Sequence, residues 1–184
     1  MARRGLARLG LAWSFLIRME AKCPFTIVID SREQLPWHFL NIKGDAKYNH
    51  KRIEVPTVWK KLDAGDYSIL GMENLVAVER KNISDCFNSC GQGRARFQRE
   101  MQRLAMLAFA AVVIEADWDE IRRRPPEHTR LRPKVVYRTA LSWSVRYGVQ
   151  WWAMPGRGIA ELTCFRMLEK FWEQNQKKGI SHVT

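Results

Sequence analysis

The chain has 184 residues, with 31 lysines and arginines against 19 aspartates and glutamates, which leaves a formal net charge of +12. Its hydrophobic fraction of 46%, with only 11 glycines and 7 prolines, excludes a disordered or collagen-like chain and is sufficient for one domain with its own core. No apolar run approaches the roughly 20 residues that cross a bilayer, so we expect no membrane partner and a positive surface that binds a polyanion.

The N-terminal residues combine basic side chains with a short apolar run. Four arginines and no acid surround the run over residues 9–17: Arg3, Arg4, Arg8 and Arg18. This pattern resembles a signal or transit peptide, but the run ends at an arginine rather than at a small-residue cleavage site. We therefore interpret residues 1–22 as an extension, extraneous or loosely docked, and residues 23–184 as the folded domain.

The cysteines indicate the compartment. They form no C-x-x-C pair and have no histidine at zinc-site spacing, which argues against a structural zinc: Cys23, Cys86, Cys90 and Cys164. Four cysteines in a chain of this length are also no disulfide scaffold. We expect reduced thiols and a location in the cytoplasm or, in a eukaryote, in the nucleus.

The first half of the domain has the patterns of short strands and turns. Residues 25–29 form a uniformly apolar, β-branched run, typical of a strand covered on both faces. A polar stretch over residues 31–52 predicts a loop or short helix. Three further extended segments follow, separated by turn residues: 55–62, 67–70 and 75–78. Together these segments predict a meander of antiparallel strands.

In the second half the period of the apolar residues changes to that of helices. Asn82 or Ser84 can cap a first helix, and Phe97, Met101 and Leu104 mark the apolar face of a second. The remaining segments alternate between strand and helix: a strand at 111–115, helices at 117–124 and 133–147, a strand at 149–153 and a helix at 158–176. This alternation predicts an α/β fold in which helices flank a central mixed β-sheet.

Two acids and a lysine form the clearest chemical pattern. Because side chains alternate along a strand, Glu79 and Lys81 point to the same face, and a hairpin can bring Asp66 beside them. Carboxylates are the ligands that Mg²⁺ prefers, and an ammonium offsets charge on transition-state oxygens. The pattern favours phosphodiester hydrolysis, although a bare D…E-x-K also occurs by chance among solvated residues.

The residues around this pattern resemble a known family. Asp30-Ser31-Arg32-Glu33 after a strand, Gly65-Asp66-Tyr67, Val78-Glu79-Arg80-Lys81 with Asp85 four positions on, and Gly93-Arg94 with Gln98 are similar to the nuclease domain of XPF-type structure-specific endonucleases, in the PD-(D/E)xK group. The resemblance spans about residues 25–176. It implies the restriction-endonuclease-like three-layer fold and a metal-dependent endonuclease of branched or flapped DNA.

Roles for individual residues follow from this resemblance. It implies that Asp66, Glu79 and Asp30 bind Mg²⁺ or Mn²⁺, and that Lys81 is the catalytic lysine. The other residues implied at the site are Glu33, a further acid, and Arg32 and Arg80, which contact phosphate or brace the acids. The residues expected to contact DNA are Arg94, Arg96, Gln98, Lys43 and Lys47. Asp85 near a helix N-terminus has an equally good structural role as a cap.

One segment and one module depart from the family pattern. The segment between Glu33 and Val55 has no counterpart that we can place; its Trp37 and Phe39 either stack on unpaired bases or, as we prefer, pack into the core. Many relatives carry a helix-hairpin-helix module after the nuclease domain, and we expect a stand-alone nuclease domain here.

The C-terminal third is rich in aromatic residues. Relatives pair through their last helices, so the resemblance implies a homodimer. An exposed stripe through Phe165, Leu168 and Trp172 would be evidence for it, and a packed monomer core is the alternative.

Two other functions stay open. One is a non-catalytic DNA-binding partner subunit, which would normally lack the acids and lysine, and the other is a restriction or genome-processing nuclease of the same chemistry.

Overall fold

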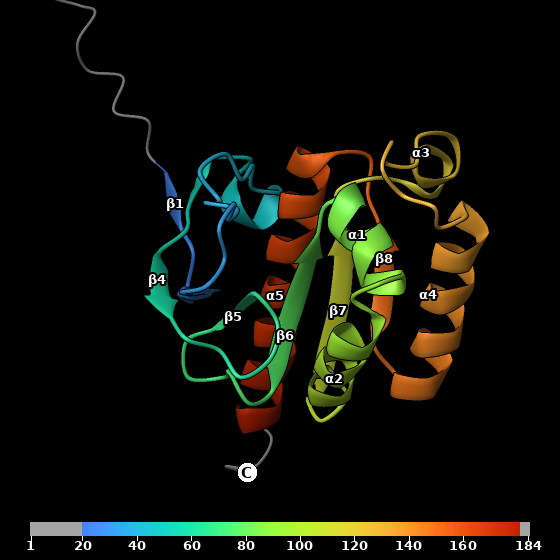
Figure 1. Ribbon diagram of the computed structural model, residues 1–184. Coiled ribbons are helices and arrows are strands. Elements are labelled where there is room, and N and C mark those ends of the chain that lie inside the picture. Colours follow the sequence, from blue (N-terminus) through green and yellow to red (C-terminus); the bar gives the residue numbers. More distant parts are fainter. Residues whose placement is uncertain (1–19, 181–184) are drawn as a thin grey trace, which may run out of the picture.

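The computed structural model describes residues 20–180, with side chains described through residue 177. At its centre lies a six-stranded mixed sheet in the order β4-β2-β5-β6-β7-β8 (Figure 1). The strands are β2 (Ile27–Asp30), β4 (Thr57–Lys60), β5 (Tyr67–Ile69), β6 (Val76–Lys81), β7 (Phe109–Ile114) and β8 (Gln150–Ala153). The apolar residues 27–29 of β2 reflect its place inside the sheet, where all four of its residues, including Asp30, are buried.

The strand directions correct part of the sequence prediction. β5 runs antiparallel to both of its neighbours, β2 and β6, as a meander requires. However, β4 pairs with β2 in parallel, with Ile27 opposite Thr57 and Asp30 opposite Lys60. Parallel neighbours need a crossover of about a dozen residues or more, and the chain between Asp30 and Thr57 is long enough to be that crossover.

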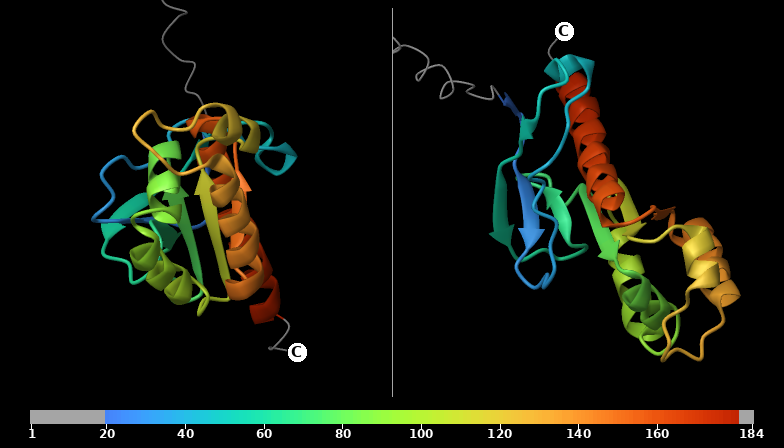
Figure 2. Two further views of the ribbon diagram at one scale, coloured as in Figure 1. Left: turned by 45° about the vertical axis from the view of Figure 1, so that its right-hand side comes forward. Right: turned by 90° about the horizontal axis from the view of Figure 1, so that it is seen from above.

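Helices cover both faces of the sheet, which makes three layers (Figure 2). One face carries α1 (Ile83–Cys90), α2 (Arg94–Leu104), α3 (Trp118–Arg123) and α4 (Pro133–Tyr147), and the other carries α5 (Arg157–Ile180). Local signals set the boundaries: the side chain of Asn82 accepts the Asp85 amide of α1 at 2.9 Å, and Gly148 ends α4 with a φ of 68°. The predicted restriction-endonuclease-like α/β fold is therefore observed.

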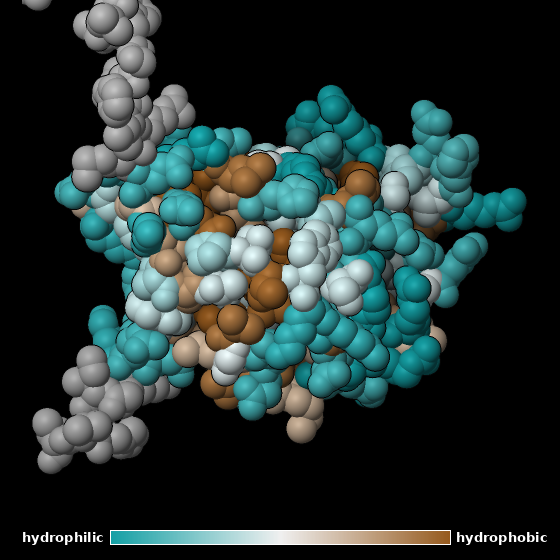
Figure 3. Space-filling view, turned by 90° about the vertical axis from the view of Figure 1, so that its left-hand side faces the viewer, coloured by the Kyte–Doolittle hydropathy of each residue, from teal (hydrophilic) through white to brown (hydrophobic). Residues whose placement is uncertain are grey.

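The segment between β2 and β4 packs against α5. It contains the 3₁₀ helix η1 (Ala46–Tyr48) and β3 (Ile53–Glu54), and β3 pairs in parallel with β1 (Ala21–Lys22). Trp37 and Phe39 are each only 1% exposed and contact Tyr67, so they belong to the core, as preferred from the sequence. Figure 3 shows the side of the molecule on which β4 forms the edge of the sheet, where apolar areas lie between larger hydrophilic ones.

Part of the aromatic C-terminal third packs inside the monomer, although Trp152 of β8 is 43% exposed. Phe165 and Leu168 of α5 are fully buried, and Phe165 stacks on Phe25 with ring centroids 6.1 Å apart. The α5 stripe that would be evidence for a dimer is therefore buried at Phe165 and Leu168 and half-buried at Trp172. Residues 1–19 of the predicted extension lie outside the described residues, whereas Ala21–Lys22 belong to β1. Within the described part, no helix is both long and apolar enough to span a membrane.

The core role of the segment is testable at two neighbouring residues. We expect Phe39→Ala to lower the free energy of unfolding by about 3–5 kcal/mol, because it removes a buried ring and leaves a cavity. Leu40→Ala is the matched control, since Leu40 is 64% exposed and its truncation should be nearly neutral. Urea denaturation of both variants measures this; equal stabilities would show that the segment adds little to the fold.

Candidate active site

A notch opens between the sheet and α2, beside the ends of β5 and β6. It encloses about 270 Å³ and is lined by Asp30, Arg32, Gly65, Asp66, Glu79, Lys81, Ser89, Arg96, Phe97, Glu100 and Arg103. The notch thus brings together Asp66, Glu79 and Lys81, as the strand pattern predicted, and surrounds them with three arginines. We call its three arginines, Arg32, Arg96 and Arg103, the basic rim of the notch.

The turn before β5 places Asp66 at this notch. Gly65 has a φ of 72° and lies so close to β6 that an added Cβ would be 2.9 Å from the Cβ of Ala77, so only glycine fits. The Asp66 amide donates to the carbonyl of Val78 at 2.9 Å. Its carboxylate oxygen Oδ2 in turn accepts the backbone amide of Arg80 at 2.7 Å. The side chain of Asp66 therefore takes the place of a backbone acceptor where the β5–β6 ladder ends.

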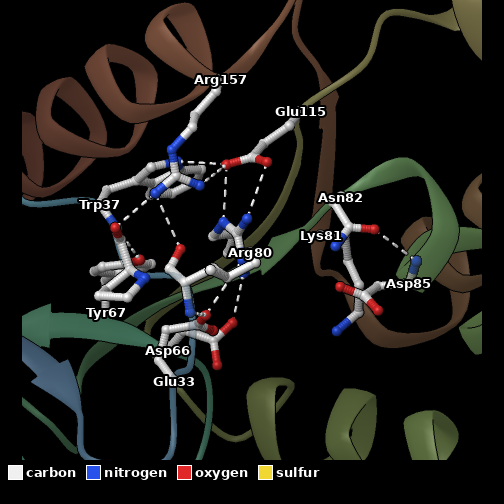
Figure 4. Close-up of polar contacts among 12 residues, drawn as sticks. Glu33, Trp37, Asp66, Tyr67, Arg80, Lys81, Asn82, Asp85, Glu115 and Arg157 are labelled. Carbon is white, nitrogen blue, oxygen red and sulfur yellow. Dashed lines mark hydrogen bonds and ion pairs between the residues drawn. The ribbon is translucent and has the colours of Figure 1, made fainter.

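The strand period of β6 places the other two groups. Glu79 and Lys81 both point toward the α1 and α2 face, and the Lys81 ammonium donates to the Glu79 carboxylate. The Lys81 Nζ also lies 4.5 Å from the centroid of the Phe97 ring in α2. Figure 4 shows Lys81 and the first turn of α1, capped by Asn82.

Burial and the charges of neighbouring acids change the pKa of both Asp66 and Glu79. Burial, and then the charge of Glu79, raise the pKa of Asp66 well above its usual value. Burial also raises the pKa of Glu79, against the opposing charge of Lys81 and with a further increase from Glu100. For Lys81, burial lowers the pKa, but the charges of Glu79 and Asp66 outweigh it and the net pKa is raised. Two carboxylates therefore lie near a single ammonium group, and a further cation would offset their negative charge.

The donor set fits a divalent cation with two carboxylates rather than three. Asp66 and Glu79 supply hard oxygen ligands of the kind that Mg²⁺ binds, with waters and phosphate oxygens to complete its shell. Among the side chains of residues 20–177, however, no three acids, histidines or cysteines lie together in a metal-binding arrangement. Asp30 lines the same notch but does not join the other two as a third ligand.

Asp30 instead ties two loops together. Its carboxylate accepts hydrogen bonds from the Arg32 amide, from Arg32 Nε and Nη2 at 2.8 and 2.9 Å, and from the Leu62 amide at 2.7 Å. These hydrogen bonds and the Arg32 charge outweigh burial and lower the pKa of Asp30. Of the two roles considered for Arg32, the structure shows the bracing of an acid by paired hydrogen bonds.

Arg80 and Glu33 lie away from the notch. Because its neighbours on β6 face α2, the Arg80 side chain projects to the α5 face. There its guanidinium donates to Glu115 at 2.8 and 3.0 Å and to Glu33 at 3.2 Å (Figure 4). Its side chain therefore braces acids and is directed away from any phosphate bound in the notch.

The expected DNA-contacting residues lie in different parts of the structure. Arg96 lines the notch, and Gln98 is half-buried on α2 outside it. Arg94 packs between helices: it donates to Thr139 Oγ1 at 2.8 Å and its guanidinium carbon lies 4.7 Å from the Trp143 ring centroid. Its contacts are those of a residue that joins α2 to α4.

Lys43 and Lys47 lie in the segment that packs on α5, on the opposite side of the sheet from the notch. The Lys47 ammonium forms ion pairs with Glu169 and Glu173, and the Lys43 carbonyl accepts a hydrogen bond from Arg166. The structure thus separates these two lysines from the notch, and their expected contact with DNA stays a prediction. The positive charge of Lys47 therefore helps to hold the segment on α5, whereas the Lys43 side chain is exposed.

Sequence reasoning missed Glu100 and Arg103, which also line the notch. Glu100 accepts the Gly65 amide at 2.8 Å and also pairs with Arg103. A signal was present, because Arg96, Glu100 and Arg103 have the i, i+4, i+7 spacing of one helix face. Asp85, the sequence candidate in the first turn of α1, donates its amide to the cap and affects Lys81 only through its charge.

Comparison with known proteins supports the fold and defines the family. The structure is similar to XPF from Aeropyrum pernix, with a TM-score of 0.56 and 20% identity over 86% of this chain and 68% of that chain. XPF from Aeropyrum pernix in complex with DNA matches with a TM-score of 0.54 and 19% identity, over 82% of this chain and 66% of that chain. Comparison with curated proteins gives no significant match. The model of the ERCC4 domain matches residues 29–157, more than half of the sequence, and the chain therefore belongs to the ERCC4 domain family.

Proposed function

We propose that the protein is a divalent-metal-dependent DNA endonuclease that hydrolyses phosphodiester bonds in branched or flapped DNA. The observation that carries this proposal is the convergence of Asp66, Glu79 and Lys81 in one open notch rimmed by arginines. The ERCC4 domain match and the fold of an XPF that was solved with DNA support DNA as the polyanion. The retained acids and lysine argue against a non-catalytic partner subunit.

The residues of the notch divide the chemistry between them. Asp66 and Glu79 would hold Mg²⁺ or Mn²⁺, which supplies the charge that polarises the phosphate and lowers the pKa of a bound water. Lys81 keeps its proton, because its pKa is raised, and so its ammonium can offset the negative charge that gathers on phosphate oxygens. Arg96, with its exposed side chain at the rim, can position the phosphate backbone.

Activity tests the two central residues. We expect the protein to cut DNA with Mg²⁺ or Mn²⁺ and not with a chelator, and Asp66→Asn or Lys81→Met to lower the cleavage rate by at least about a hundredfold. The matched controls are Asp63→Asn in the same turn and Lys134→Met on α4, which change exposed residues and should cut normally. If Asp66→Asn and Lys81→Met cut as well as the parent, this site is not the catalytic one.

The same assay also tests the substrate class. It compares cleavage of flaps, forks, four-way junctions and plain duplex, and so separates a structure-specific enzyme from a restriction or genome-processing nuclease.

Binding tests the basic rim. We expect Arg96→Ala to weaken DNA binding and to reduce the slope of log K against log salt by about 1, because one phosphate contact and its released counterion are lost. Lys43→Ala is the matched control, since Lys43 lies on the α5 side. Fluorescence anisotropy with labelled DNA at several salt concentrations measures both slopes. A slope that changes for Lys43→Ala but not for Arg96→Ala would place the DNA on the other face.

We also propose that two copies of the chain pair through α4. Tyr137, Leu141 and Val145 recur every four residues along this helix, and their side chains are 50%, 52% and 90% exposed. A two-fold axis would place such a stripe against itself and bury it. This location replaces the stripe on α5 as the support for the homodimer that the family resemblance implies.

Sedimentation velocity tests this pairing. We expect twice the monomer mass of 21.6 kDa for the parent and the monomer mass for Leu141→Asp, because the variant buries a charge in the interface. Met106→Asp is the matched control: Met106 is equally apolar and 84% exposed, but lies after α2. A monomeric parent, or a Leu141→Asp variant that remains a dimer, contradicts pairing at α4.

A further inference from the structure

One carboxylate outside the notch collects donors from three parts of the fold. Glu115 is the first residue after β7, and its carboxylate accepts Arg80 Nε and Nη2 at 2.8 and 3.0 Å, Trp37 Nε1 at 2.7 Å and Arg157 Nη1 at 2.8 Å. Figure 4 shows Glu115 between Arg80 and Arg157. The contacts join β6, the segment after β2 and the start of α5. Neither the sequence pattern nor the proposed chemistry uses Glu115.

Arg80 depends on this carboxylate for its conformation. The Arg80 side chain is 5% exposed, and its guanidinium carbon lies 5.8 Å from the centroid of a Trp37 ring. A buried guanidinium is stable only when its donors are paired, and a carboxylate that accepts two parallel N–H groups also fixes its orientation. Glu115 supplies both of these parallel bonds, while Glu33 supplies one bond at 3.2 Å.

The backbone of Arg80 is part of the notch although its side chain is not. Its amide is the donor that orients the Asp66 carboxylate, at 2.7 Å. The residues on either side of it along the chain, Glu79 and Lys81, point into the notch. Any shift of the Arg80 main chain therefore moves all three groups of the proposed site at once. The Arg80 side chain is held from the opposite face of the sheet, and Glu115 is its main partner there.

We propose that Glu115 is a positioning residue of the nuclease: by fixing Arg80 on the α5 face, it sets the backbone that orients Asp66, Glu79 and Lys81 on the other face. The proposal rests on the function proposed above. Glu115 does not line the notch, and its side chain is 10% exposed beneath two arginines and a tryptophan, so it does not touch the substrate. We therefore expect substitution of Glu115 to lower the reaction rate and to leave the affinity for DNA nearly unchanged.

The test compares Glu115→Gln with Trp37→Phe. Glutamine has the same size but no charge, and its amide group would face a guanidinium donor, so Arg80 loses its paired bonds. Trp37→Phe removes one donor to Glu115 and leaves the Arg80 pair intact. We expect Glu115→Gln to lower kcat roughly ten- to a hundredfold with little change in KM for DNA, since small displacements of reacting groups have effects of this size. Trp37→Phe should keep the parent kcat.

Hydrogen exchange gives a second readout that does not need activity. In Glu115→Gln, backbone amides over residues 78–82 should exchange faster than in the parent, whereas Trp37→Phe should leave them unchanged. Glu115→Asp keeps the charge on a shorter side chain and should fall between the two, which also serves if the glutamine variant does not fold. The measurements use the full chain, at a temperature well below unfolding.

Several results would overturn the proposal. An unchanged kcat for folded Glu115→Gln, a rise in KM alone, or an equal loss in Trp37→Phe would each show that Glu115 does not act through Arg80. Lower stability with a normal kcat would make it a purely structural residue. If the parent cuts no DNA, the function proposed above fails, and faster exchange over residues 78–82 still decides whether Glu115 controls this backbone.

Discussion

The site depends on the bond between the Arg80 amide and the Asp66 carboxylate. It forms where the β5–β6 ladder ends, beside the tight turn at Gly65, and there the Asp66 side chain takes the place of a backbone acceptor. β6 then presents alternate side chains to two different layers. Glu79 and Lys81 face the notch and Arg80 faces α5. A single strand thereby connects the acidic notch to an ion-pair cluster on the opposite face of the sheet.

The surroundings of Asp66 and Glu79 disfavour the charged forms of both carboxylates, which indicates a functional site. Burial and the charges of neighbouring acids raise the pKa of both Asp66 and Glu79, although the Lys81 charge opposes this at each of them. Acids in such surroundings are typical of functional sites, because a cation or a substrate completes the charge balance that the protein leaves unbalanced. In the cluster around Glu115, by contrast, each buried charged group is paired with a group of opposite charge.

The segment after β2 accounts for several features that the family pattern left open. It is the crossover that makes β4 parallel to β2, it buries Trp37 and Phe39, and its Lys47 pairs with acids of α5. The exposed apolar stripe lies on α4, on the other face of the sheet. The segment therefore lies on the α5 face of the sheet, opposite the face on which we propose that DNA binds.

The sequence alone determined what depends on short-range geometry. Strand alternation put Glu79 and Lys81 on one face, Asn82 capped the next helix, and helical spacing marked Phe97, Met101 and Leu104 as buried. Only the tertiary structure decided the parallel pairing of β4, the separation of Lys47 from the notch, the packing of Arg94 against Trp143 and the role of Glu115. These features join residues far apart in the chain, and a basic or acidic side chain has the same local pattern whether it meets solvent, DNA or a buried partner.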